Sequence, residues 1–233
     1  MKKRIEVVFS SHASPEENLK FSNHIDDTIG VSHGTHCYKN FNQYSLPQIY
    51  NKAIHELSQY QPLDEVIYVF CHNDIIFKTK DWGKKLLKHF NRGKLDKRHD
   101  IIGVAGTTYL PESGRWWEKP QRMVGIVEHT NGLREWVSEY SKPHFGVKNT
   151  VLVDGLFLAF DPDTIIHKFD ENYKGFHFYD VVWCFKNFLD GCNVGVVTDI
   201  RILHKSVGIT NQQWEENRIQ FANEYKDDLP YTL

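Results

Sequence analysis

Apolar residues recur along the chain at two spacings, one typical of buried strands and the other of amphipathic helices. Segment 65–71 is almost continuously apolar, as expected for a strand that is covered on both faces. Ile49, Ala53 and Leu57 instead recur at helical spacing. The whole pattern predicts strands at 5–10, 37–38, 65–71, 101–106, 151–153, 156–160, 194–197 and 200–203, and helices at 15–27, 46–60, 81–90, 178–189 and 212–225. This alternation predicts an α/β fold.

The middle of the chain departs from this alternation. Segments 123–128 and 133–137 both have strand character, and they flank Asn131 and Gly132, which favour a two-residue hairpin turn. Asp161, followed by a proline, predicts the start of a further helix. We therefore expect a mixed, mainly parallel sheet with flanking helices and one inserted antiparallel hairpin.

Length and charge limit the domain count and the partners. The chain has 233 residues and neither a repeat nor a long linker, so we expect a single domain over 1–233. Its 28 basic and 30 acidic side chains give a formal net charge of −2. Such a balance provides no long-range field for holding a phosphate backbone, so we expect no nucleic acid partner.

Cysteine spacing and hydropathy indicate the compartment. The four cysteines form no C-x-x-C pair, which is typical of reduced thiols in a cytoplasmic protein. The apolar run at 5–9 is interrupted by Glu6 and is too short for a signal peptide. No segment reaches the ~18 apolar residues that a membrane span needs. We expect a cytoplasmic protein without a transmembrane segment.

Polar side chains follow the predicted strands directly. In an open α/β sheet, ligands bind at the carboxyl ends of the strands, because loops and helix amino termini converge there. The candidates at these ends are Ser10, Ser11, His12, His72, Asn73, Asp74, Asp154 and Gly155.

Two of these ends offer metal ligands. His72 and Asp74 are two residues apart, so in a continued strand both side chains would point to one side and share a divalent cation. His204, which follows another predicted strand, offers a ring nitrogen for the same purpose. In the alternative interpretation Asp74 only turns the chain, and the two histidines are ordinary loop or surface residues.

Two further features have both a functional and a structural interpretation. Asp180 lies in the first turn of the helix at 178–189, where an acid either serves chemistry or simply complements the helix dipole. Trp116 and Trp117 lie in a proline-flanked loop. Their rings either stack on a sugar or base, or fold back as a hydrophobic plug.

No G-x-G-x-x-G, G-K-[ST] or G-x-S-x-G motif is present.

Four segments together resemble the GT-A class of nucleotide-sugar-dependent glycosyltransferases, particularly the small bacterial family-2-like group. They are IEVVFSS, QIYNKAIHE, VIYVFCHNDIIF and GFHFYDVVWCFKNFLDGCNVGVVTDIRILH. In that family a D-x-D-like triplet holds the metal and the donor diphosphate, and here the triplet is HND, with only the last acid retained. The resemblance implies a divalent cation, Mn or Mg, on Asp74 and His204.

The resemblance also assigns the remaining roles. It implies that Asp180 is the catalytic base, in place of the family's acidic pair. The donor side would comprise Ser10, Ser11, His12, Asn51, His72 and Asn73, and the acceptor side Asp154, Gly155, Tyr179, Trp116 and Trp117. The family's usual aspartate pair that reads the nucleobase is missing, so no nucleobase is predicted.

The implied function is inverting transfer of a sugar from a nucleotide-diphosphate donor to a saccharide or other hydroxyl acceptor, in surface polysaccharide or glycoconjugate synthesis. Residues 1–107 would form the donor half, 108–210 the acceptor half and 211–233 a C-terminal helix, with peripheral membrane contact allowed. One alternative is a catalytically silent carbohydrate-binding or scaffold protein. A less favoured one is a nucleotidyltransferase, because segment 10–14 carries no lysine or arginine.

Overall fold

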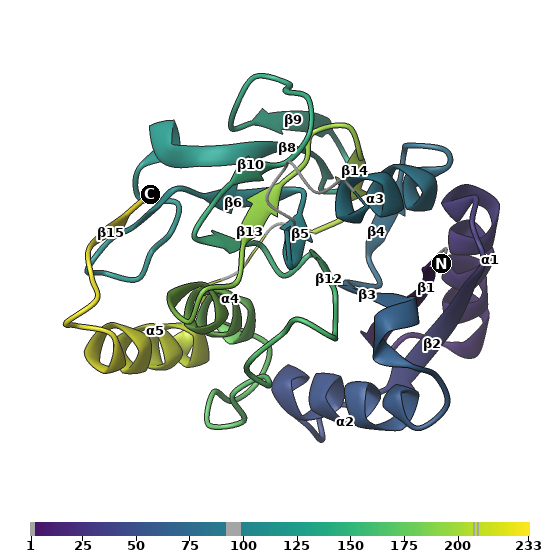
Figure 1. The fold of residues 1–233 in the computed structure, drawn as a ribbon, viewed down its shortest axis with the longest axis horizontal. Coiled ribbons are helices and arrows are strands. Elements are labelled where there is room, and N and C mark those ends of the chain that lie inside the picture. The colour runs from purple at the N-terminus through teal and green to yellow at the C-terminus, as the bar shows by residue number, and fades with distance from the viewer. Residues whose placement is uncertain (1–2, 92–98, 207, 209) are drawn as a thin grey trace.

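The computed structural model describes residues 3–91, 99–206, 208 and 210–233. In Figure 1, sheets run through the middle of the molecule and helices lie around them. The helices and strands are β1 (Arg4–Ser11), α1 (Pro15–Ile29), β2 (His33–Lys39), α2 (Leu46–Ser58), η1 (Leu63–Glu65), β3 (Val66–Cys71), β4 (Ile75–Phe77), α3 (Trp82–Phe90), β5 (Ile101–Gly103), β6 (Ala105–Thr107), β7 (Tyr109–Leu110), η2 (Pro120–Arg122), β8 (Met123–Thr130), β9 (Glu135–Glu139), β10 (Lys148–Asn149), β11 (Leu152–Val153), β12 (Phe157–Phe160), α4 (Tyr179–Leu189), β13 (Val194–Val196), β14 (Ile202–His204), α5 (Gln212–Glu224) and β15 (Tyr231–Thr232).

The main sheet is mixed. Its strand order is β10-β13-β5-β12-β3-β1-β2. Strands β2, β1 and β3 are parallel neighbours, and β13 is parallel to β5. Strand β12 runs antiparallel between β3 and β5. The predicted mixed α/β sheet with flanking helices is confirmed, but among the described strands it is not mainly parallel, because β10, β12 and their neighbours pair antiparallel.

Alternating side chains of the central strands supply two hydrophobic cores. Val7 and Phe9 of β1 pack with buried residues of α1 and α3. Val8, which points to the opposite face, packs with Phe70 and with α2 and α4. Each fully buried side chain of this kind contributes roughly 1.5–3 kcal/mol to folding. The continuous apolar run of β3 is explained by this burial on both faces.

A second sheet extends the first at the carboxyl end of β3. Its strand order is β11-β6-β8-β14-β4, and β9 pairs with β8. The hairpin of β8 and β9 is the predicted antiparallel insertion. Its tip is shifted, however, because Asn131 donates its backbone N–H to the Arg134 carbonyl at 3.3 Å. Gly132 and Leu133 therefore form the tip instead of Asn131 and Gly132. The Asn131 side chain accepts hydrogen bonds from the Leu133 and Arg134 backbone, which explains the shift.

Three predicted elements differ in the structure. No helix begins at Asp161; residues 162–164 form a turn, and the buried Asp161 carboxylate pairs with Lys3 at 2.7 Å. Strand β2 is longer than 37–38, because its polar residues pair with β1 along their whole length. The predicted strand at 101–106 divides into β5 and β6, which belong to different sheets.

The ends of two helices follow local rules. Ser14 caps α1 by accepting a hydrogen bond from the Glu17 backbone, and Glu17 accepts one in return from the Ser14 N–H at 3.0 Å. Asn211 caps α5 by accepting from the Trp214 N–H at 2.9 Å. After α5 the chain continues to β15, which pairs with β7, so segment 211–233 is a helix followed by a short strand.

Candidate active site

His72, Asp74 and His204 meet beyond the carboxyl end of β3. His72 and Asp74 follow β3 directly, while His204 is the last residue of β14. Strand β14 pairs antiparallel with β4, which places His204 opposite Ile75. One ligand atom from each of the three side chains lies within 4.8 Å of the others. The geometry therefore brings together both predicted metal ligands and His72, which was predicted for the donor side.

The environment of this His–Asp–His cluster suits a cation. Asp74 Oδ1 lies 3.4 Å from His204 Nε2 and 3.9 Å from His72 Nδ1. This oxygen is buried and accepts no hydrogen bond among the described residues. A bound cation would satisfy it. Side chains of His72 and Asp74 remain about one-third exposed, at 33% and 35%, so a ligand has access.

Electrostatic interactions set the protonation states of the cluster. Burial opposes ionisation of Asp74, but the adjacent His204 more than offsets it and holds the pKa of Asp74 well below its usual value. Burial lowers the pKa of His72, so this ring is neutral at neutral pH. Burial also acts to lower the pKa of His204, and the contact with Asp74 reverses that effect and raises it. A neutral imidazole and a carboxylate are the forms in which these groups bind metals, so His72 and Asp74 are in the metal-binding form, whereas His204 must give up its proton to a cation that replaces it beside Asp74.

Tyr179 links the cluster to the start of α4. Its buried hydroxyl donates to the Gly155 carbonyl at 3.1 Å and lies 3.2 Å from His72 Nε2. We assign the Nε2–H tautomer to His72 because the hydroxyl donates to Gly155, and this assignment leaves the lone pair on Nδ1, the nitrogen that faces Asp74. Tyr179, which was predicted for the acceptor side, is the first residue of α4, and its hydroxyl connects that helix to the His–Asp–His cluster.

Asp180 lies in the first turn of α4, as predicted. Its Oδ2 accepts a hydrogen bond from the Gly155 N–H at 2.8 Å. Burial and the negative charge of Asp154 raise the pKa of Asp180 to about 7. This carboxylate can therefore accept a proton near neutral pH, which an ordinary aspartate does poorly.

Asp154 and Gly155 lie between Asp180 and the cluster. The charge of Asp154 acts on Asp180, on His72 and on His204, which places these four groups in one electrostatic environment. Asp154 accepts a hydrogen bond from the Leu156 N–H at 2.9 Å. A Cβ on Gly155 would lie 2.1 Å from the Tyr179 hydroxyl, so the close approach of α4 requires glycine.

The other donor-side predictions separate into two groups. Ser11 is buried and accepts a hydrogen bond from Asn73 Nδ2 at 2.8 Å, next to His72 and Asp74. Ser10 is partly buried and His12 is exposed, both at the end of β1. Asn51 has a different use, because its amide donates to and accepts from the Phe169 backbone at 2.9 and 3.0 Å. These bonds tie α2 to the segment before α4, and donor binding by Asn51 stays a prediction.

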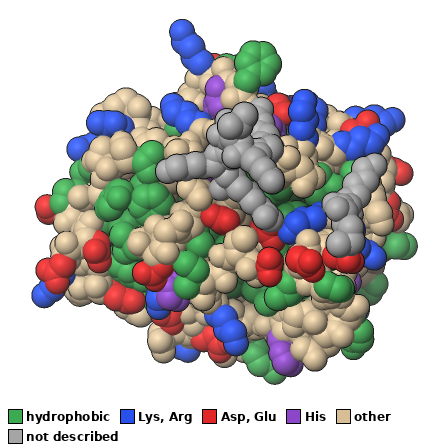
Figure 2. Space-filling view, viewed as in Figure 1, with side chains coloured by type: hydrophobic (Ala, Val, Ile, Leu, Met, Phe, Trp, Pro, Cys, Tyr) green, Lys and Arg blue, Asp and Glu red, His purple; other side chains and the backbone are tan. Residues whose placement is uncertain are grey.

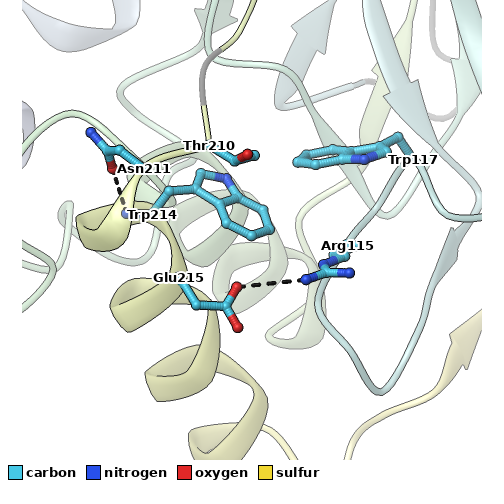
Figure 3. Close-up of a pocket in the computed structure, with 6 residues that line it drawn as sticks. All are labelled: Arg115, Trp117, Thr210, Asn211, Trp214 and Glu215. Atoms are coloured by element: carbon cyan, nitrogen blue, oxygen red, sulfur yellow. Dashed lines mark hydrogen bonds and ion pairs between the residues drawn. The ribbon is translucent and has the colours of Figure 1, made fainter.

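The two loop tryptophans differ in their burial. Trp116 is 7% exposed and packs in the core, which makes it the hydrophobic plug. Trp117 is 38% exposed and lines a cavity of about 350 Å³ (Figure 3). The other lining residues are Arg115, Thr210, Asn211, Trp214 and Glu215. The His–Asp–His cluster does not line this cavity.

Sequence reasoning missed His129 at the cluster and every residue that lines the cavity except Trp117. The ring of His129 lies 6.0 Å from that of His204, because β8 and β14 pair in parallel with these two residues opposite each other. Arg115 and Trp214 line the cavity. Arg115 adjoins the tryptophan pair, so the sequence offered a weak signal for it. Nothing local distinguishes His129 or Trp214, which only the tertiary contacts bring into place.

Comparisons with known proteins identify the family of the chain. Residues 16–225 match the family described as "Glycosyltransferase like family". None of the curated proteins matches the chain. Within the part of the chain that is described, no helix is both long and apolar enough to cross a membrane.

Several solved structures share the fold at low sequence identity. The chain is similar to GalNAc-T7 with UDP, GalNAc and Mn²⁺, at 8% identity and a TM-score of 0.62, over 97% of this chain and 49% of that chain. It is similar to the mannosyltransferase PcManGT from Pyrobaculum calidifontis in complex with GDP-Man and Mn²⁺, at 10% identity and a TM-score of 0.55, over 97% of this chain and 65% of that chain. It is also similar to the catalytic domain of Drosophila beta1,4galactosyltransferase 7 in complex with xylobiose, at 11% identity and a TM-score of 0.52, over 93% of this chain and 79% of that chain. The chain thus spans about half the length of the first, and the predicted GT-A fold is confirmed.

Proposed function

The chain belongs to the glycosyltransferase like family, and we propose that it transfers a sugar from a nucleotide-diphosphate donor to a hydroxyl acceptor with inversion at the anomeric carbon. The observation that carries this proposal is the convergence of the His72–Asp74–His204 cluster and Asp180, joined through Tyr179. The cluster, with a cation bound, can neutralise a leaving diphosphate, while Asp180 accepts the proton of the attacking hydroxyl.

His72, Asp74 and His204 would hold a divalent cation. Bound there, the cation supplies a Lewis acid for the diphosphate oxygens on which negative charge develops as the sugar leaves. Two imidazoles and one carboxylate suit Mn²⁺ better than Mg²⁺, because Mg²⁺ prefers oxygen ligands. Three protein ligands also leave coordination positions for the donor. The similar structures named above that contain Mn²⁺ and a nucleotide support this assignment.

Asp180 acts as the general base in this proposal. The acceptor hydroxyl attacks the anomeric carbon from the face opposite the diphosphate, and its proton passes to the Asp180 carboxylate. The Gly155 N–H holds that carboxylate in place at 2.8 Å. Positioning of this kind contributes more to the rate than basicity alone, and a pKa of about 7 adds to it.

We assign the donor to residues 1–107 and the acceptor to residues 108–210, with segment 211–233 beside the acceptor half. Ser11 and Asn73 would face the donor beside the cluster. On the family resemblance, we further propose a cytoplasmic role in surface polysaccharide or glycoconjugate synthesis.

Replacement of Asp180 by asparagine tests the proposal. Asparagine keeps the acceptor oxygen for the Gly155 N–H but cannot take a proton. We expect D180N to lose at least about 10³-fold in transfer rate, while titration calorimetry shows nucleoside diphosphate binding with Mn²⁺ within about threefold of wild type. Near-normal turnover of D180N would contradict the base assignment. Nucleotide binding by the wild type without donor hydrolysis or transfer would favour the silent scaffold instead.

A further inference from the structure

The cavity beside Trp117 lies between two segments that are distant in sequence. One wall is the loop between β7 and η2, and the other is the start of α5. Figure 3 shows Trp117 and Trp214 on opposite walls with Arg115 beside them. In Figure 2, hydrophobic side chains gather to the left of centre, over the part of the molecule where Figure 1 places α4 and α5.

Both walls are held firmly. Arg218 of α5 donates to the Ser113 carbonyl at 2.7 Å, which ties the loop to the helix. Gly114 turns the loop with a φ of 72°, and a Cβ there would meet the Phe221 ring at 3.1 Å. Glu215 accepts from Arg218 through both oxygens, at 2.6 and 2.8 Å. The cavity is therefore preformed, which lowers the entropic cost of binding a ligand.

The lining combines an aromatic surface with a cationic donor. The rings of Trp117 and Trp214 lie 5.4 Å apart, tilted by 40°, and Trp117 keeps 38% of its surface exposed. The Arg115 guanidinium lies 5.7 Å from the Trp214 ring centroid. Its contact with Glu215 is a long ion pair of 3.7 Å, since Arg218 already occupies both Glu215 oxygens. Arg115 therefore retains N–H groups that can donate to a ligand.

This cavity is coupled to the helix that carries the proposed base. Phe178, directly before α4, packs its ring 5.3 Å from Trp214 and 5.7 Å from Phe221. Phe178 adopts a left-handed φ of 63°, which costs energy for a non-glycine residue and indicates a tightly determined position. Asp180 is two residues further along. A molecule in the cavity would thus lie next to the segment that presents Asp180.

We propose that this cavity is an acceptor subsite that binds a hexopyranoside ring. The apolar face of the sugar stacks on Trp117, and Arg115 donates hydrogen bonds to the sugar oxygens. Flat rings with a few polar donors are the chemistry that recognises saccharides, whose C–H faces are apolar and whose edges carry hydroxyls. The acceptor role of this saccharide rests on the proposed function, whereas saccharide binding itself can be measured without a donor.

The test uses the full chain and methyl hexopyranosides as probes, both neutral hexosides and a uronide. Saccharide binding is followed by NMR without donor or metal. We expect at least one glycoside to bind saturably, W117A to weaken its binding at least tenfold, and W117F, which keeps a ring, to stay within threefold. R115A should weaken it at least threefold. Tyr60→Ala, which removes an aromatic that is 86% exposed elsewhere, should leave binding unchanged.

Two results would overturn the inference. One is that no glycoside of the panel binds, and the other is that W117A binds as the wild type does while remaining folded by circular dichroism. Donor hydrolysis with Mn²⁺ separates this inference from the proposed function. We expect the KM for the acceptor to rise at least tenfold in W117A, whereas Tyr60→Ala should keep both the wild-type KM and the wild-type rate of donor hydrolysis. Absence of hydrolysis in the wild type would contradict the proposed function, and the glycoside titration would still decide whether the cavity binds a saccharide.

Discussion

At the scale of single residues, the orientation of His72 depends on Tyr179. The tyrosine hydroxyl accepts from His72 Nε2 because its own proton is donated to the Gly155 carbonyl. This leaves His72 Nδ1 as the nitrogen that would bind the proposed cation together with Asp74. Outer contacts of this kind fix the ring and tautomer of a metal-binding histidine.

Replacement of Tyr179 by phenylalanine is therefore expected to weaken Mn²⁺ binding about tenfold, because His72 loses the partner that orients it. The change removes only a hydroxyl, so packing should be kept. Mn²⁺ titration followed by electron paramagnetic resonance measures the affinity. Tyr38→Phe removes a hydroxyl that donates to Glu56 on α2, away from the cluster, and serves as the matched control. Equal Mn²⁺ affinity of Y179F and wild type would contradict the role of Tyr179.

The raised pKa of Asp180 predicts a pH dependence. Since the base must be ionised, transfer should increase from about pH 5 and level off above about pH 8, with an apparent pKa of about 7. Stability should change in the opposite direction. A carboxyl whose pKa is raised by folding favours the folded state at low pH, and this contribution is lost as pH rises through 7.

We compare the melting temperatures of wild type and D180N without metal. The wild-type value minus the D180N value should fall between about pH 4 and about pH 7, from the ordinary pKa of an aspartate to its raised value in the folded state. The asparagine variant is the matched reference, because it keeps the shape of the side chain and cannot titrate. A difference that stays constant over this interval would show that the pKa of Asp180 is not raised by folding.

At the scale of elements, the site depends on how closely the start of α4 approaches the turn before β12. Glycine at position 155 permits this approach, and the hydrogen bonds from Tyr179 and to Asp180 both use the Gly155 backbone. One turn therefore holds both the positioning tyrosine and the proposed base.

Gly155→Ala should displace the start of α4, because the new Cβ would lie 2.1 Å from the Tyr179 hydroxyl and 3.1 Å from Asp180 Cβ. We expect a loss of ~1–3 kcal/mol in unfolding free energy together with a large loss of transfer activity, measured by denaturant titration and by product formation. Gly191→Ala, at the other end of α4, is the control. It has a φ of +103° and open space around its Cβ, so it should cost ~1 kcal/mol from backbone strain alone and keep activity.

At the scale of the whole molecule, the two sheets bring distant segments together. Strand β3 ends the parallel part of the main sheet, and β14 reaches the same place through its pairing with β4 and β8. His72 and Asp74 thereby meet His204, which lies far along the chain. A ligand that bridges them is expected to stabilise the folded state.

Mn²⁺ with a nucleoside diphosphate should raise the melting temperature, and excess chelator should reverse the metal-dependent part. At a ligand concentration of about 100 times Kd the stabilisation is ~2.7 kcal/mol, which corresponds to ~5–10 °C for a domain of this size. Differential scanning calorimetry measures it. Asp74→Asn should remove the response to Mn²⁺. Asp26→Asn, which alters a similar His–Asp pair with His33 on the outer side of α1, should keep it.

Local pattern determined much of the architecture before any tertiary contact was known. The apolar run of β3 and the amphipathic α4 could be predicted because burial imposes a periodicity on neighbouring residues. Polar β2 and the divided segment of β5 and β6 were predicted less well. Their limits are set by pairing with strands elsewhere in the chain, and local spacing carries little information about such partners.

Local patterns in the sequence were enough to predict the α/β class, the carboxylate at the end of β3 and the acid at the start of α4. Each of these depends on residues a few positions apart. Tertiary structure alone decided that His72 and His204 flank Asp74, that Tyr179 faces inward, and that Trp117 forms a cavity with Trp214 while Trp116 is buried. The physical reason is that strand register and helix packing fix which distant side chains meet, and both arise from contacts summed over the whole fold.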